Sequence, residues 1–169
     1  DLPETVQAHF RELSIAGKRF GGLHAVSGTL GSSAEGSVRL ALMELIFRSV
    51  GLPAQYNLAE FVLWLRDEKL EDPVKVYLEA NNYDWNEELD NLLVAEGIRE
   101  ALIQLKPNLF SNVQICNEIL LDRFKSRGDI SRDEMVKTIK RTLSRDGRFP
   151  LTLVALDEVQ QFIGQNEDR

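Results

Sequence analysis

Two apolar segments of strand length lie at opposite ends of a long stretch with helical periodicity, and this spacing constrains the fold more than any other feature. Residues 23–29 have the pattern of a short strand, and Leu151–Leu156 is a continuous apolar run between a proline and two acidic residues. Such a run is typical of a strand that is buried on both faces of a parallel sheet. Parallel neighbours need a long crossover between them, so the two segments can pair in one sheet. The sequence therefore predicts a helix-rich α/β fold.

The residues between the two segments contain helix starts and stops. Pairs with capping-box spacing, or spacing close to it, are Asn57 with Glu60, Asp84 with Glu87, Ser111 with Gln114 and Ser131 with Glu134. In each pair the first side chain can accept a hydrogen bond from an unpaired backbone amide. Apolar stripes follow these caps, and glycines and prolines separate them. We expect a short helix over 5–13, about six helices between 35 and 146, and a single domain over 1–169 in which 35–146 is a helical insertion.

Composition and cysteine usage narrow the class of protein. Of the 169 residues, 43% are hydrophobic and 28% are charged, which fits a globular chain and neither a disordered nor a fibrous one. No stretch approaches the ~20 apolar residues of a membrane helix, so we expect no membrane contact. The single cysteine, Cys116, gives no internal disulfide and fits a reducing compartment. His9 and His24 lie far apart without cysteine partners, so we interpret His24 as a packed histidine and expect no zinc site.

The last apolar run ends in a pair of acids that has the form of a Walker B motif. Leu153–Leu156 lead directly into Asp157 and Glu158. A rigid strand would hold Asp157 at the sheet edge where nucleotides bind, and its carboxylate can orient Mg²⁺ beside the phosphates. Glu158 can then polarise the water that attacks the γ-phosphorus. The alternative is that both acids only cap the next helix.

A phosphate-binding loop is the part of an ATPase that these 169 residues lack. The pattern G-x-x-x-x-G-K-[ST] does not occur, and Gly17-Lys18 is followed by Arg19. The loop Gly28–Ser33 lies between a predicted strand and a predicted helix, where backbone amides can hold an anion. It contains no lysine, so we favour its interpretation as a helix-entry loop.

Several segments together resemble one protein family, the large P-loop ATPases of BREX phage-defence systems (BrxC/PglY-like). The resemblance spans roughly residues 20–164 and rests on Gly22–Gly31, Ser37–Leu42, Phe47–Pro53, Asp133–Val136 and, most strongly, Pro150–Gly164. It implies a partial P-loop NTPase core of the additional-strand type, in which 23–29 and the Walker B strand 151–158 are neighbours. It also implies that Asp157 is the Mg²⁺-associated acid and Glu158 the catalytic, water-activating acid.

The resemblance further implies a cytoplasmic bacterial ATPase that uses ATP and Mg²⁺ and acts with other defence proteins. Because the phosphate-binding loop is missing, the chain looks like a piece of a longer ATPase that starts after that loop and ends just after Walker B. We expect the parent protein to hydrolyse ATP and the isolated chain to bind ATP very weakly and to be inactive. Open strand edges lead us to expect a homo-oligomer, or helices over those edges.

Charge is distributed unevenly along the chain. The formal net charge is −7, which argues against a general nucleic-acid coat protein. Residues 60–100 hold 12 acidic and 4 basic side chains, whereas 123–148 hold 9 basic and 4 acidic ones. Lys137, Lys140, Arg141 and Arg145 could contact nucleic acid, but we favour a solvated basic face. No aromatic side chains interleave with these bases, so a stacking surface for single strands is not indicated.

Two other classes of protein compete with the ATPase hypothesis. One is a non-enzymatic, mainly helical interaction module in which Asp157 and Glu158 cap a helix. The other is a degenerate NTPase domain that is regulatory and does not bind nucleotide. A phosphate-binding loop encoded upstream of Asp1 would favour the ATPase.

Overall fold

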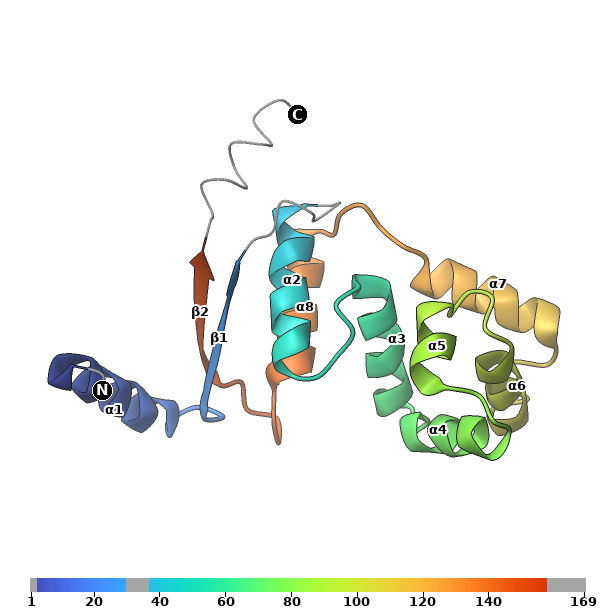
Figure 1. The fold of residues 1–169 in the computed structure, drawn as a ribbon, viewed down its shortest axis with the longest axis horizontal. Helices are drawn as coiled ribbons and strands as arrows, with labels where there is room; N and C mark the ends of the chain where they lie inside the picture. The colour runs from blue at the N-terminus through green and yellow to red at the C-terminus, as the bar shows by residue number, and fades with distance from the viewer. Residues whose placement is uncertain (1–2, 30–36, 158–169) are drawn as a thin grey trace, which may run out of the picture. The chain divides into compact units, whose positions relative to one another are not determined.

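A computed structural model describes residues 3–29 and 37–157 of the protein, and its fold is a helix-rich α/β arrangement (Figure 1). The helices are α1 (Glu4–Gly17), α2 (Val38–Ser49), α3 (Tyr56–Asp67), α4 (Glu71–Ala80), α5 (Trp85–Asp90), α6 (Glu96–Leu105), α7 (Val113–Phe124) and α8 (Arg132–Leu143). The strands are β1 (Leu23–Thr29) and β2 (Leu151–Asp157). Seven helices therefore lie between 37 and 146, where about six were predicted; one of them, α5, is a helix of only 6 residues.

The two strands form one parallel sheet, as predicted from the sequence. Leu23 is paired with Leu151 and the register continues to Thr29 with Asp157. We call the end where both strands begin the amino edge, and the end where both finish the carboxyl edge. This pairing brings together the two ends of the long helical stretch.

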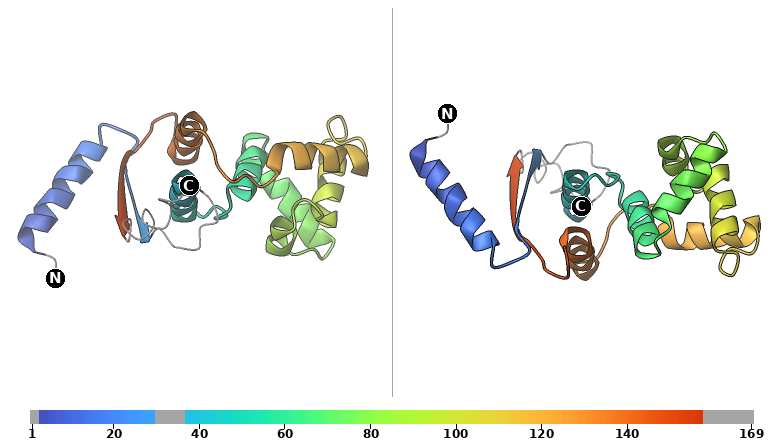
Figure 2. Two further views of the ribbon diagram at one scale, coloured as in Figure 1. Left: turned by 90° about the horizontal axis from the view of Figure 1, so that it is seen from above. Right: turned by 90° about the horizontal axis from the view of Figure 1, so that it is seen from below.

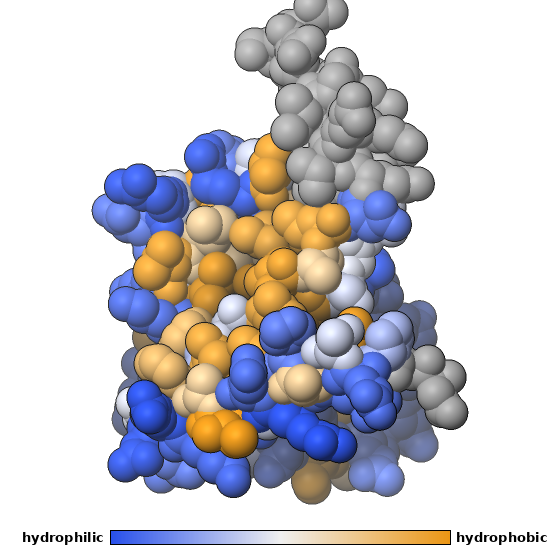
Figure 3. All heavy atoms as spheres, turned by 90° about the vertical axis from the view of Figure 1, so that its left-hand side faces the viewer, coloured by the Kyte–Doolittle hydropathy of each residue, from blue (hydrophilic) through white to orange (hydrophobic). Residues whose placement is uncertain are grey.

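Helices α2 and α8 lie on the same side of this sheet, and α1 lies on the other (Figure 2). The strand residues that face α2 include Gly28, where a Cβ atom would lie only 2.4 Å from the Leu45 Cδ2 atom. On the opposite face, Leu23 and Leu153 are 36% and 43% exposed, and apolar side chains gather on this side of the unit (Figure 3). The prediction that 151–156 is buried on both faces is therefore wrong for the described part of the chain, because helices pack closely on one face only.

The chain divides into two compact units. The sheet unit comprises Asp1–Gly51 and Gly128–Arg169, and the helical unit comprises Leu52–Arg127. Residues 35–146, predicted as one helical insertion, are thus shared: α2 and α8 belong to the sheet unit, and α3–α7 form the helical unit. No helix among the described residues has both the length and the apolarity needed to cross a membrane.

The helical unit has an aromatic core of its own. The rings of Phe61 and Phe124 pack edge to face with their centroids 5.2 Å apart, and Trp64 packs on Phe110 in the same way with a centroid distance of 6.0 Å. In α7 the buried line is Cys116, Leu120 and Phe124, whereas the predicted stripe of Ile115 and Ile119 is only half-buried. The buried face of α7 is thus shifted by one residue from the predicted stripe, and its last member, Phe124, contacts Phe61 and Trp64 in the ring cluster.

Two of the four predicted caps are confirmed and two are wrong. Ser131 and Glu134 form a complete capping box at α8, and Asp84 accepts from the Glu87 amide at 2.9 Å. Helix α7 instead uses Asn112, one residue after the predicted Ser111, which accepts from the Ile115 amide at 3.0 Å. The Asn57 side chain caps no N-terminus, since its amide donates to the Phe124 carbonyl at the end of α7. There it satisfies a carbonyl that has no partner within the helix.

Candidate functional site at the carboxyl edge of the sheet

The candidate site is built on the last residue of β2. Asp157 ends this strand with an exposed side chain, and its register partner is Thr29, the last residue of β1. Alternation along parallel strands places both side chains on the sheet face opposite α2 and α8. The second predicted site residue, Glu158, lies outside the described residues, as do residues 30–33 of the predicted loop Gly28–Ser33.

Both covering helices begin at the carboxyl edge. Arg39 in the first turn of α2 pairs with Asp129, which closely precedes α8. At the other end of α2, Ser49 Oγ lies 2.9 Å from the His24 Nε2 atom at the start of β1. Helices α2 and α8 therefore both run from the carboxyl edge to the amino edge. The positive ends of their dipoles are therefore at the same end of the sheet as Asp157, on the opposite face.

Asp129 uses the polar donors at the start of α2. The Arg39 Nε atom donates to Asp129 Oδ1 at 3.1 Å, and a second guanidinium nitrogen donates to the other carboxylate oxygen. Together with the Ser37 side chain and the Ile130 amide, Arg39 holds the pKa of Asp129 at about 2. Because this pKa lies below the ordinary value of 3.8, the link is present above about pH 4 and is lost as the pH falls to about 2. Ser37 and Arg39 are thus already engaged by a carboxylate.

Oxygen ligands at the carboxyl edge fit a magnesium ion in kind. Carboxylate and hydroxyl oxygens are the hard ligands that Mg²⁺ prefers, and Mg²⁺ is often held by one or two carboxylates together with water and substrate phosphates. Asp157 and Thr29 supply such atoms. Within 3–29 and 37–157 there is no group of three or more His, Cys, Asp or Glu side chains that could hold a metal ion. The described residues of this edge thus offer one carboxylate and one hydroxyl.

Nucleophilic chemistry is not supported by the two groups that could suggest it. The Ser49 hydroxyl donates to the Ile46 carbonyl at 2.6 Å, so its contact with His24 requires the imidazole Nε2–H to donate. An imidazole that donates to a serine cannot take the proton of that serine. Burial and the charge of Arg145 lower the pKa of His24. Burial raises the pKa of the Cys116 thiol to about 11, so this cysteine is inert.

The predicted basic residues do not converge on the candidate site. Lys137 and Lys140 are exposed on α8, Arg141 is half-buried on the same helix, and Arg145 lies in the turn that follows. Because α8 runs toward the amino edge, Arg145 is at the opposite end of the sheet from Asp157.

Comparison with known proteins gives no relative for this chain. No family model, no curated protein and no solved structure matches it.

The sequence predicted Asp157 but did not single out Thr29, although the predicted pairing of 23–29 with 151–156 contained the signal that places the two strand ends together. The engagement of Arg39 and Ser37 by Asp129 joins residues far apart in the chain, and no local pattern indicates it.

Proposed function

We propose that this chain is the part of a P-loop ATPase core that handles Mg²⁺ and the attacking water. The observation that carries the proposal is the position of Asp157 at the end of a parallel strand, in register with the end of its neighbour. In open α/β sheets, ligands bind outside the carboxyl ends of the strands. The resemblance of Pro150–Gly164 to the BREX ATPases supports ATP as the ligand and anti-phage defence as the setting.

Each acid has a defined role in this proposal. Mg²⁺, when bound, neutralises phosphate charge in the transition state. Asp157 would hold that ion through one of its water ligands, and Thr29 adds a hydroxyl on the same face of the sheet. Glu158 would orient the attacking water and accept its proton. Other defence proteins, in the bacterial cytoplasm, would be the partners.

Replacement of Asp157 tests the proposal. In the parent protein we expect Asp157→Ala to weaken Mg²⁺-dependent ATP binding and turnover by about 10- to 100-fold, because an acid that orients a metal through water is lost. Turnover measured against Mg²⁺ concentration reports the effect. Asp90→Ala is the matched control, since Asp90 is an exposed acid at the end of α5 in the helical unit.

Two outcomes would contradict the metal role of Asp157. Unchanged turnover with an unchanged Mg²⁺ dependence would show that the carboxylate only caps the chain that follows. An equal loss in Asp157→Ala and Asp90→Ala would show a general effect of removing an acid.

The isolated chain of 169 residues should not bind ATP on its own. These residues lack the amides and lysine of a phosphate-binding loop, and the donors of Ser37 and Arg39 are engaged by Asp129. Little then remains to offset the phosphate charge. Titration calorimetry with ATP and Mg²⁺ should give no saturable heat. A tight saturable signal would show that the loop Gly28–Ser33 binds phosphate.

A further inference from the structure

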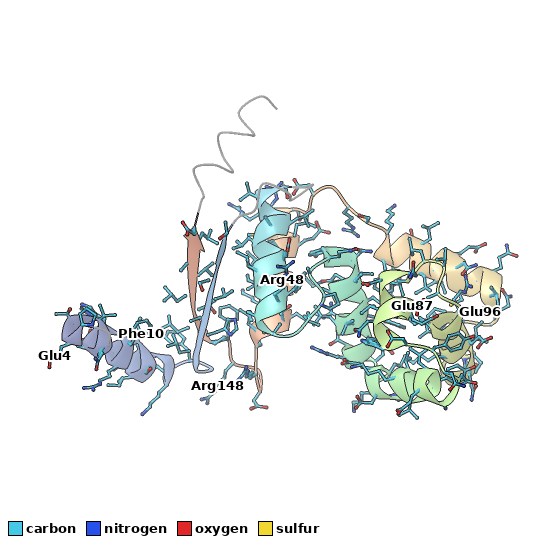
Figure 4. All side chains as sticks on the ribbon, in the orientation of Figure 1. Glu4, Phe10, Arg48, Glu87, Glu96 and Arg148 are labelled. Atoms are coloured by element: carbon cyan, nitrogen blue, oxygen red, sulfur yellow. The ribbon has the colours of Figure 1, made fainter. Side chains whose placement is uncertain are left out.

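Two turns that are far apart in the sequence meet at the amino edge of the sheet. The Gly21 amide, after α1, donates to the Phe149 carbonyl, before β2, at 3.0 Å. A Cβ atom on Gly21 would lie 2.5 Å from the Arg148 carbonyl oxygen, so only glycine permits this approach. Phe20 directly precedes Gly21, so both aromatic residues adjoin this backbone contact in the chain. Figure 4 shows the labelled Arg148 at this end of β1.

Four cationic residues lie within a few positions of this contact along the chain. Lys18 and Arg19 follow α1, and Arg145 and Arg148 flank the turn before β2; all four are exposed. Within the described part of the chain none of them has a salt bridge. We call these cations, together with Phe20 and Phe149, the amino-edge cluster.

The turn before β2 holds two of these cations directly opposite each other. The backbones of Arg145 and Arg148 exchange hydrogen bonds of 3.0 and 2.9 Å across the turn. Asp146 and Gly147 occupy its centre with φ values of 50° and 74°, as a tight hairpin turn requires. Side chains at directly opposed positions are neighbours, and like charges there are destabilising. Asp146, the one acid of the turn, lies at its tip and forms no salt bridge with either arginine. A polyanion bound beside the two arginines would relieve their repulsion.

Two aromatic rings are exposed among these cations. Phe20 is 51% exposed and Phe149 is 37% exposed. Neither ring stacks on another ring or under a cation in residues 3–29 and 37–157. Exposed rings beside unpaired cations are the two components with which proteins bind single-stranded nucleic acid: bases stack on the rings, and the cations follow the phosphates.

We propose that the amino-edge cluster binds single-stranded nucleic acid, with bases on Phe20 and Phe149 and phosphates on the arginines and lysine around them. A duplex is a poorer match, because its bases are already stacked and only the cations could contact it. The proposal does not rest on the ATPase function. Strands of seven residues place the cluster about 20 Å from Asp157, so each site can fail independently of the other.

Fluorescence anisotropy with a labelled 20-mer of deoxythymidine tests the proposal. We expect saturable binding by the 169-residue chain at 50 mM salt, with Kd of about 10⁻⁶ to 10⁻⁴ M. Phe20→Ala and Phe149→Ala should each weaken binding by about 5- to 150-fold. The slope of log Kobs against log salt is negative, and the double variant R145A/R148A should reduce its magnitude by about 1.4, or about 0.7 for each lost phosphate contact.

Matched controls separate this site from general charge attraction. K137A/K140A removes two exposed cations from α8, and it should change the affinity less than twofold. An abasic 20-mer with the same phosphates should bind at least tenfold more weakly than the deoxythymidine 20-mer. Circular dichroism verifies the fold, and Asp146 and Gly147 are left in place to preserve the turn.

Any of three results would overturn the proposal. The first is the absence of binding at 50 mM salt with the chain at 100 μM. The second is equal affinity for the abasic 20-mer or for a duplex, which would mean that the rings do not stack on bases. The third is an equal loss of affinity in K137A/K140A and R145A/R148A, which would mean that the cations act only through the overall electrostatic potential of the protein.

Discussion

In the parent protein, Glu158→Gln is expected to lower ATP turnover by about 10²- to 10⁴-fold while ATP binding remains largely intact. Glutamine keeps the size and hydrogen-bonding shape of glutamate but cannot accept the proton of the attacking water, and help from a general base is worth about this much. The proposal places Glu158 directly after Asp157, the residue that ends β2 at the carboxyl edge. Steady-state hydrolysis and nucleotide binding, measured on the same preparation, report the two quantities separately.

Glu79→Gln is the matched control for this experiment, because Glu79 is an exposed glutamate on α4 in the helical unit. If Glu158 only caps a helix, its replacement will leave turnover unchanged and cost at most about 1 kcal/mol of stability. Wild-type hydrolysis rates in the Glu158→Gln protein would end the Walker B hypothesis.

The second large effect concerns the stability of the helical unit. Phe61→Ala should lower the free energy of unfolding of this unit by about 3–5 kcal/mol, because a fully buried ring is lost and a cavity remains. Phe61 is 0% exposed, and the centroid of its ring lies 5.2 Å from that of Phe124 and 6.0 Å from that of Trp64. Both tryptophans of the chain, Trp64 and Trp85, lie in residues 52–127. Tryptophan fluorescence during urea denaturation therefore reports on the helical unit.

Val76→Ala is the control, since Val76 on α4 is 65% exposed and its truncation should change the free energy of unfolding by less than about 0.5 kcal/mol. A loss below about 1 kcal/mol for Phe61→Ala would show that the ring cluster is not a packed core. An equal loss in both variants would show that burial does not decide stability there.

Local patterns predicted the parts of the fold that depend on neighbouring residues. The strands at 23–29 and 151–156, and the caps at Asp84 and Ser131, follow from short-range chemistry and are present. The assignments at Asn57 and Ser111 are wrong for different reasons. The Asn57 side chain donates to a carbonyl 67 residues away. Ser111 and Asn112 are adjacent and both suit an N-cap, so their sequence alone does not decide which of them begins α7; in the structure it is Asn112.

Long-range packing explains what the sequence could not predict about the sites. Asp157 was predicted because a strand followed by acids is a local pattern. The amino-edge cluster was not, since Phe20 and Phe149 are far apart in the sequence and adjoin one another's segment only through strand pairing and the hydrogen bond from Gly21. The expectation that no aromatic side chains interleave with the basic residues of 123–148 concerned the order of residues in the sequence. In the folded chain Phe149 follows Arg148, and its carbonyl accepts from Gly21, the residue after Phe20.

The parallel course of α2 and α8 has a consequence for how this protein could be shortened or could have grown. The chain leaves the end of α2 at the amino edge and must re-enter at the start of α8 at the carboxyl edge, a distance set by the 12 residues of α2 at about 18 Å. Direct fusion of Gly51 to Gly128 would leave six residues, 50–51 and 128–131, between the two helices, and six residues reach about 20 Å only when they are fully extended. Residues 52–127 make this return as a compact unit of their own, and we expect a different segment that bridges the same distance without strain to leave the register of β1 and β2 unchanged.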